Sequence, residues 1–299
     1  MGLKHSTLSA FAASSGCGKS TYLIGLCMSL ASKGERVLLC SNESQLSDLQ
    51  AQFLVWFLSR YMNYWKVSKR KLISGKLTDE DKTMIRMARK IYKEKFGKSI
   101  KVVTMADMDS KLNVQVIKNA ILRDGISCFV IDTFKLSFSY NRNDSFWLSL
   151  VEDTRALAEV CLKYNVIGLM TIQLAINAQN RSWLTADCLS NSKAIKEVLS
   201  NLVLFRKAIP ELEFDPGSPY YIHPFRSKQN ENGEWYKEPY APDPSKVWRI
   251  FFIDKARRGP DSNDLNEAYL SRFDADYSSF YETSKCVPSR RIFNTESSR

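Results

Sequence analysis

The chain has 299 residues, of which 44% are hydrophobic and 25% are charged, a composition typical of a folded globular protein. No apolar run reaches the roughly eighteen residues that a transmembrane helix needs, and the first residues lack the apolar core of a signal peptide. Lysine and arginine outnumber aspartate and glutamate by 43 to 32, and the resulting net charge of +11 predicts a polyanionic partner. Basic runs such as Lys66–Lys71 are interpreted as solvated helix faces.

The cysteines and histidines do not form a pattern typical of a metal site. Seven cysteines are scattered without a C-x-x-C pair, and the two histidines, His5 and His223, are far apart in the sequence. Cys40, Cys128 and Cys161 lie inside apolar stretches, where cysteine acts as a small buried hydrophobic residue. We therefore expect an intracellular, cytoplasmic protein in a reducing compartment, without a zinc site.

Short apolar runs alternate along the chain with segments in which apolar residues recur at helical spacing. The predicted strands are Thr7–Ala12, Arg36–Ser41, Ile100–Thr104, Ile126–Asp132, Val166–Ile172, Leu202–Phe205 and Trp248–Ile253. The predicted helices are Lys19–Ser32, Ser47–Tyr64, a charged helix that begins with the capping box Thr78–Asp81 and ends near Phe96, Asn113–Leu122 and Asp144–Tyr164. This alternation predicts an α/β fold with a mostly parallel sheet flanked by helices.

Two segments depart from this alternation. Between Pro210 and Pro244, proline, glycine, asparagine and tyrosine dominate without helical periodicity, which predicts a hairpin or insertion at the edge of the sheet. Residues 276–299 are rich in serine and arginine and contain few aliphatic side chains, which is typical of a flexible tail. We therefore expect one domain over residues 1–275, with an insertion at about 208–246, followed by a tail.

The segment Ala13–Ser20, which reads Ala-Ser-Ser-Gly-Cys-Gly-Lys-Ser, joins the first predicted strand to the first predicted helix and has the pattern of a phosphate-binding P-loop. Its glycines let backbone N–H groups curl around phosphate oxygens, and the N-terminus of the following helix adds positive partial charge. Lys19 would reach the β- and γ-phosphates, and the Ser20 hydroxyl would bind Mg²⁺. Ala13 replaces the usual first glycine, which a negative φ at that position tolerates. The predicted cofactors are ATP and Mg²⁺, and the predicted nucleotide-binding residues are Ala13, Ser14, Ser15, Gly16, Cys17, Gly18, Lys19, Ser20 and Thr21.

Three polar residues follow predicted strands at the edge where ligands of α/β sheets bind. Asp132 ends an apolar strand, where a carboxylate can hold Mg²⁺ beside Ser20. Glu43 follows the second strand, where a carboxylate could polarise an attacking water. Gln173 ends a later strand, and its amide could report on the γ-phosphate. The pattern alone leaves Glu43 and Gln173 equally open to interpretation as ordinary polar loop residues.

The order of these features resembles the RecA-like ATPase domain of DnaB-type replicative helicases, over roughly residues 7–275. The resemblance rests on Ala13–Ser20, Ser41–Glu43, Phe129–Asp132, Thr171–Leu174, Ser192–Lys196, Asn201–Phe205 and Asp254–Pro260. The last of these, with the pattern K-x-R-x-G-P, is the most specific.

The resemblance implies a role for each matched residue. Glu43 matches the catalytic glutamate that activates water, and Gln173 matches the γ-phosphate sensor. Lys255 and Arg257 match the pair that is supplied to the nucleotide of a neighbouring subunit, with Arg257 as the arginine finger. Catalysis would then depend on a subunit interface, so the resemblance implies a homo-oligomeric ring, expected to be a hexamer.

The resemblance also implies a loop that grips single-stranded DNA in the channel of the ring. The predicted DNA-binding residues are Ser190, Asn191, Lys193 and Lys196, whose lysines would contact phosphates without sequence preference. Where the family carries an Arg-Glu-Ser-Gly pattern, this chain has Ser-Asn-Ser-Lys at 190–193. The P-loop begins at residue 13, so we expect no counterpart of the family's N-terminal primase-binding domain, as in a compact phage- or plasmid-encoded helicase.

These features together predict an ATP-dependent ring helicase that translocates on single-stranded DNA and unwinds duplex DNA in replication. Its further partners would be a primase or a helicase loader. Two alternatives remain at this point. One is a RecA-like recombination ATPase that forms filaments on DNA. The other is a non-catalytic, nucleotide-bound scaffold of the replisome.

Overall fold

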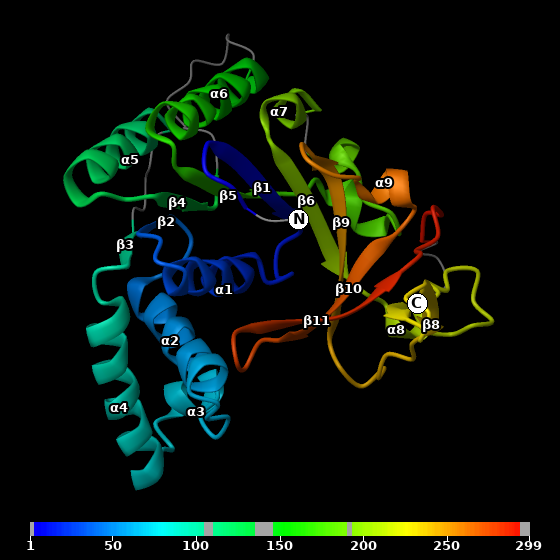
Figure 1. The fold of residues 1–299 in the computed structure, drawn as a ribbon, viewed down its shortest axis with the longest axis horizontal. Coiled ribbons are helices and arrows are strands. Elements are labelled where there is room, and N and C mark those ends of the chain that lie inside the picture. The colour runs from blue at the N-terminus through cyan, green and yellow to red at the C-terminus, as the bar shows by residue number, and fades with distance from the viewer. Residues whose placement is uncertain (1–2, 105–109, 135–145, 190–192, 294–299) are drawn as a thin grey trace.

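The computed structural model describes residues 3–104, 110–134, 146–189 and 193–293, and one large β-sheet runs through them (Figure 1). Within these ranges the sheet has 11 strands in the order β3-β2-β4-β5-β1-β6-β9-β10-β11-β7-β8. The strands are β1 (Thr7–Ala13), β2 (Val37–Ser41), β3 (Ile100–Thr104), β4 (Cys128–Asp132), β5 (Ile167–Gln173), β6 (Asn201–Lys207), β7 (Phe225–Gln229), β8 (Trp235–Pro239), β9 (Trp248–Ala256), β10 (Ala268–Asp274) and β11 (Ser279–Cys286).

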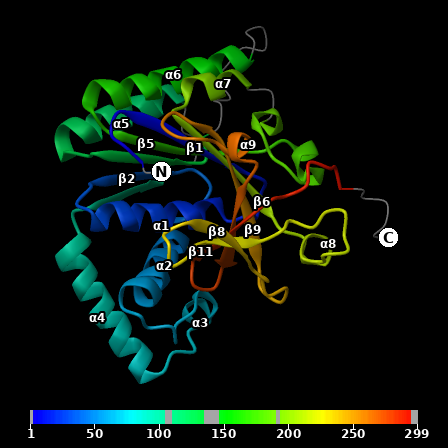
Figure 2. The same ribbon diagram turned by 45° about the vertical axis from the view of Figure 1, so that its right-hand side comes forward.

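Helices cover both faces of the parallel part of the sheet, with α5, α6 and α7 on one face and α1, α2 and α4 on the other (Figure 1 and Figure 2). The α-helices are α1 (Lys19–Ser32), α2 (Leu46–Trp56), α3 (Lys69–Ser74), α4 (Asp79–Phe96), α5 (Ser110–Asp124), α6 (Phe146–Tyr164), α7 (Lys193–Val198), α8 (Pro210–Glu213) and α9 (Ser262–Leu265). The shorter helical turns are η1 (Phe57–Tyr61), η2 (Ile176–Asn180) and η3 (Ala186–Cys188). None of the helices in the described ranges is long and apolar enough to cross a membrane.

The parallel half of the sheet confirms the predicted α/β fold. Strands β3, β2, β4, β5, β1 and β6 all pair in parallel, so their carboxyl ends meet at one edge. Each face of this half carries its own apolar core, one that includes Phe129 and Leu157 and another that includes Leu23 and Phe53. Burial on both faces explains why these strands are nearly continuous apolar runs in the sequence.

The other half of the sheet, from β9 to β8, is antiparallel and extends further than expected. The predicted hairpin at the sheet edge is confirmed, because β7 and β8 pair as the last two strands. Within the expected tail, Ser279–Cys286 instead form β11, which pairs with β10 along its length. Strands with one polar face lack the continuous apolar signal of a doubly buried strand, so this pairing is not evident locally.

The segment predicted as one helix over Ser47–Tyr64 is divided. The α-helix α2 passes at Phe57 into the π-helical turn η1. The Ser59 hydroxyl donates to the carbonyl oxygens of Val55 and Trp56, at 2.9 and 3.2 Å, and thereby competes for the acceptors of the regular helix. This competition gives a local reason for the change of helical type.

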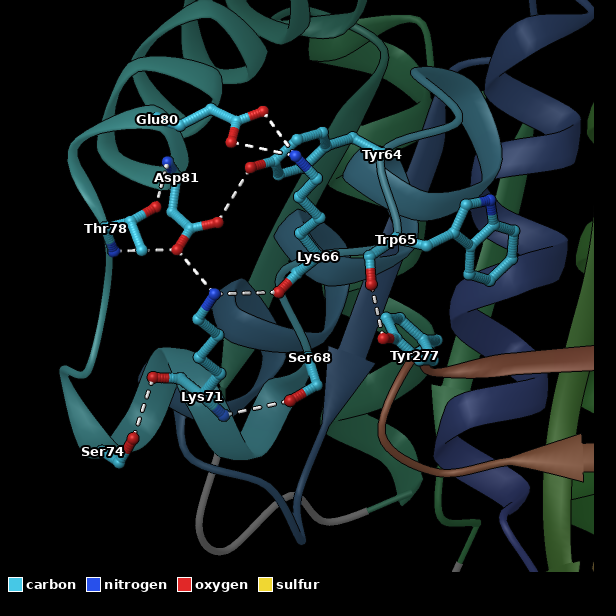
Figure 3. Close-up of polar contacts among 10 residues, drawn as sticks. All are labelled: Tyr64, Trp65, Lys66, Ser68, Lys71, Ser74, Thr78, Glu80, Asp81 and Tyr277. Atoms are coloured by element: carbon cyan, nitrogen blue, oxygen red, sulfur yellow. Dashed lines mark hydrogen bonds and ion pairs between the residues drawn. The ribbon is translucent and has the colours of Figure 1, made fainter.

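A polar cluster ties the helical layer to the turn between β10 and β11 (Figure 3). At its centre the fully buried Asp81 carboxylate accepts from the Tyr64 hydroxyl at 2.8 Å and pairs with the Lys71 ammonium at 2.6 Å. The Lys71 ammonium holds the pKa of this carboxyl far below its usual range. The Tyr277 hydroxyl, from the turn, donates to the Trp65 carbonyl oxygen. Lys71 is therefore a structural cation, whereas we expected the whole basic run to be solvated.

Candidate nucleotide-binding site and the opposite edge of the sheet

The P-loop connects the buried end of β1 to the start of α1. Ala13 is the last residue of β1, and Gly16 and Gly18 then adopt left-handed φ angles of +69° and +99°. Such angles are readily available to glycine, and they turn the chain sharply into the helix. Gly18 occupies the N-cap of α1 without a side-chain cap, so the first N–H groups of the helix remain available to an anion within the described structure.

Lys19 begins α1 and folds back over the loop. Its ammonium donates to the carbonyl oxygens of Ala13 and Ser14, at 3.1 and 3.2 Å, and the side chain is buried. The lysine is thus held at the centre of the loop, where it can exchange carbonyl partners for phosphate oxygens. The neighbouring Thr21 instead donates towards α2, to the Gln52 side chain at 3.3 Å.

The carboxylate of Asp132 lies at the carboxyl end of β4, in a ring of hydroxyl groups. The residue is only 1% exposed, and its Oδ1 accepts from the Thr171 hydroxyl at 2.8 Å. No cationic side chain pairs with it within the described ranges, although a buried carboxylate ordinarily needs a positive partner. An oxygen ligand of this kind, together with the Ser20 hydroxyl at the start of α1, fits the hard-oxygen preference of Mg²⁺.

The residue before Glu43 fixes the loop that follows β2. The Asn42 amide donates to the Thr133 carbonyl oxygen and accepts from the Thr133 N–H, both at 2.9 Å. This bracket joins the carboxyl ends of β2 and β4, and it places Glu43 at the same edge as Asp132. Glu43 itself is exposed.

Gln173 is the residue nearest to the P-loop by sheet register. It pairs directly with Ala13 across β5 and β1, and its side chain is exposed at the end of the strand. The structure therefore brings the P-loop, Gln173, Asp132 and the Glu43 loop to one edge of the sheet.

Lys255 and Arg257 lie at the opposite edge. Ala256 pairs with Asn201, and Asn201 pairs with Ser9 near the start of β1, whereas the P-loop follows the end of that strand. Arg257 lines a cavity of about 480 Å³ there, together with Lys4, His5 and Arg258.

The Lys255 side chain is partly occupied by its own chain. Its ammonium donates to the carbonyl oxygens of Lys196 and Glu197, at 2.6 and 2.9 Å. Partial burial, assisted by the nearby charges of Arg257 and Lys196, lowers the pKa of Lys255. A partner anion would therefore have to replace two carbonyl acceptors at Lys255, whereas Arg257 already faces the cavity.

The predicted DNA-binding residues can be placed only in part. Ser190 and Asn191 fall outside the described residues, and of Lys193 only its position at the start of α7 is described. Lys196 forms an ion pair with the buried Asp254 at 2.8 Å, and its side chain remains 36% exposed. The structure thus ties Lys196 to the base of the arginine-bearing turn.

Sequence reasoning missed the groups that support the P-loop from the antiparallel half. Arg249 on β9 is buried and donates from Nε to the Cys17 carbonyl oxygen at 2.8 Å. Burial lowers the pKa of its guanidinium, which nevertheless stays charged. Phe273 and Phe280 pack so closely on Gly18 that a Cβ there would lie 3.0–3.2 Å from their rings. One signal was available, because Arg249 interrupts an otherwise apolar strand.

Comparison with known proteins gives structural relatives only. No protein-family profile matches the sequence, and no curated protein sequence matches it. A solved helicase ATPase domain superimposes with a TM-score of 0.70 at 15% identity, over 94% of this chain and 86% of that chain. A DnaB-like replicative helicase, described together with its interactions with primase, gives a TM-score of 0.70 at 15% identity, over 94% of this chain and 58% of that chain. The RadB recombinase gives a TM-score of 0.55 at 10% identity, over 94% of this chain and 93% of that chain.

These similarities agree with the strand order and with the P-loop at the carboxyl edge of the sheet. The chain spans less than two thirds of the DnaB-like replicative helicase, so the similarity to that protein concerns only part of it. The protein therefore has the RecA-like P-loop ATPase fold, and its structure is similar to the solved helicase ATPase domain and to part of the DnaB-like replicative helicase.

Proposed function

We propose that this protein is an ATP-hydrolysing motor that assembles as a ring, translocates on single-stranded DNA and unwinds duplex DNA in replication. The observation that carries the proposal is the separation of the P-loop from Arg257, at opposite edges of one sheet. A ring of identical subunits would bring the arginine of one subunit to the P-loop of the next.

The residues at the carboxyl edge supply the parts that phosphoryl transfer to water needs. Lys19 and the N–H groups at the start of α1 would hold the phosphates. Mg²⁺, held by Ser20 and Asp132, would neutralise phosphate charge. Glu43 would accept a proton from the attacking water, and Gln173 would contact the γ-phosphate.

The arginine at the amino edge would complete the site of a neighbouring subunit. Its guanidinium lines an open cavity rather than a closed ion pair, which suits it to meet an incoming phosphate. An arginine finger raises turnover by roughly 10³–10⁵-fold, so hydrolysis would depend on assembly. We expect a hexamer, and a primase or a helicase loader as further partners.

The DNA track is supported by charge and by relatives. The net charge of +11 suits a polyanion, and one structural relative is a replicative helicase. Lys193 and Lys196, with Ser190 and Asn191, would contact the phosphate backbone in the channel of the ring. Lys196 would do so through the exposed part of its side chain while Asp254 holds it in place.

A second candidate is a recombination ATPase that forms an open filament on DNA. The observation that favours it is the similarity to the RadB recombinase, which covers 93% of that chain. A filament and a ring are distinguished by electron microscopy of the protein with ATP and single-stranded DNA, because only a ring closes.

The test of the main proposal is steady-state ATP hydrolysis with and without single-stranded DNA, beside the variant Lys19→Ala. We expect DNA to stimulate hydrolysis and the variant to lose it. A strand-displacement assay on a forked duplex then tests unwinding. Hydrolysis that ignores DNA, or no hydrolysis at all, would contradict the motor and favour a nucleotide-bound scaffold.

A further inference from the structure

Two cations face each other beside the P-loop, on strands of the antiparallel junction. Lys207 at the end of β6 pairs in register with Arg249 on β9. Side chains directly opposite each other in an antiparallel pair have Cβ atoms about 5 Å apart, and like charges in this position are unfavourable. Lys207 and Arg249 are therefore a costly arrangement unless something negative binds beside them.

Both side chains lie on the face of the sheet that carries the P-loop. The Arg249 guanidinium donates to the Cys17 carbonyl oxygen of the loop at 2.8 Å. The Lys207 ammonium lies 3.8 Å from the position that a Cβ of Gly16 would occupy. The loop is thus flanked by Lys207 and Arg249 on the side of β6 and β9, in addition to its own Lys19.

The two cations differ in how they are held. Arg249 is only 3% exposed, and its hydrogen bonds go to the carbonyl oxygens of Cys17 and Trp248. The Lys207 side chain is exposed, and within the described residues its ammonium makes neither a hydrogen bond nor an ion pair. The preceding Arg206 points to the other face of the sheet, where it is paired with Glu213 at 2.5 Å. Lys207 is therefore available to a ligand, whereas its neighbours are not.

We infer that Lys207 is a second phosphate-binding lysine of the nucleotide site, and that its ammonium contacts the phosphate chain of the nucleotide bound at the P-loop from the β6 side. Arg249 acts behind it as a positioning residue, because it fixes the Cys17 carbonyl oxygen away from the phosphates. The bound phosphates remove the repulsion between the two cations. This inference rests on the proposed nucleotide-binding function and adds a residue to it.

The test measures ATP affinity by calorimetry for the full chain and for Lys207→Gln, Lys207→Arg and Lys207→Glu. The matched control is Lys33→Gln, at the other end of α1, and Lys19→Ala reports on the site itself. We expect Lys207→Gln to weaken ATP binding by about tenfold, the effect of one lost charge-assisted hydrogen bond, and Lys207→Arg to restore most of it. Inorganic tripolyphosphate should compete with ATP for the wild-type protein and compete less well for Lys207→Gln.

Lys207→Glu gives a readout that a merely structural role would not produce. A carboxylate opposite Arg249 replaces repulsion with attraction, so the melting temperature without nucleotide should rise while ATP affinity falls the most. If the wild-type protein binds ATP through Lys19 and Lys207→Gln binds it equally well, the inference is overturned and the proposed function stands. If the wild-type protein does not bind ATP, both are overturned.

Discussion

The two ends of β1 carry opposite halves of a reaction. At the carboxyl end, glycines, free helix N–H groups and the buried Asp132 form a cradle for phosphate and metal. At the amino end, Lys4, His5, Arg257 and Arg258 line an open cavity, and no acidic residue of the described chain lines it. The seven residues of β1 separate the two ends by about 20 Å. One molecule therefore presents complementary surfaces that it cannot bring together, and only a second copy can join them.

The largest expected effect tests the amino end. Arg257→Ala should lower the turnover of ATP by roughly 10³-fold and leave ATP affinity nearly unchanged, because the guanidinium acts on the site of a neighbour. The measurement is kcat beside ATP affinity in the same preparation. The matched control is Arg258→Ala, which removes a charge from the same cavity. Equal loss in both variants would contradict a specific arginine finger and indicate a general charge effect.

The next effect tests the carboxyl end. Gln173→Ala should lower kcat by roughly a hundredfold, because it removes one donor beside the P-loop and leaves the binding loop itself intact. The check is kcat and KM measured with saturating single-stranded DNA. A rise in KM without a change in kcat would mean that Gln173 binds the ground state only.

A smaller effect asks whether the carboxyl end depends on the helical layer. Asp81→Ala should lower the free energy of unfolding by about 2 kcal/mol, because it leaves the Tyr64 hydroxyl and the Thr78 N–H without their acceptor. Glu80→Ala, which breaks the exposed pair with Lys66, should change it by less than about 0.5 kcal/mol. Both values are read from urea denaturation. Equal values for the two variants would contradict the structural role of Asp81.

The smallest effect concerns the charge of the amino end. A hydrogen bond to the Asn165 carbonyl oxygen, and then one to Glu35, raise the pKa of His5. The folded state therefore favours protonated His5, and this stabilisation is complete below about pH 6.5 and lost as the pH rises through the folded pKa. Because the pair is largely solvated, we expect well under 1 kcal/mol in the pH dependence of unfolding. His5→Ala should flatten that profile and His223→Asn should not, and an unchanged profile for His5→Ala would contradict the assignment.

Local sequence was sufficient for the parallel half of the sheet and for its P-loop. The helix Lys19–Ser32, the strand Ile100–Thr104 and the capping box at Thr78 occur at the predicted residues, because glycine turns, caps and apolar runs act over a few residues. The roles of Glu43 and Arg257 stay predictions that kinetics must test.

The antiparallel half could not be predicted in the same way. The strand Ser279–Cys286 has serine, glutamate and lysine among its residues, and its partner strand lies across a turn that no sequence pattern marked. The contacts of Arg249 and Lys207 with the P-loop join residues about two hundred positions apart in the chain. Such contacts follow from the order of the strands, which only the folded sheet reveals.

The most direct test of the central claim mixes two inactive variants. Lys19→Ala retains Arg257, and Arg257→Ala retains the P-loop, so an interface between one copy of each can be complete. In a random equimolar ring, about one interface in four has the intact P-loop facing the intact arginine, so hydrolysis should recover to about a quarter of the wild-type rate. A mixture that hydrolyses ATP no faster than the average of its two components would contradict a site shared between subunits.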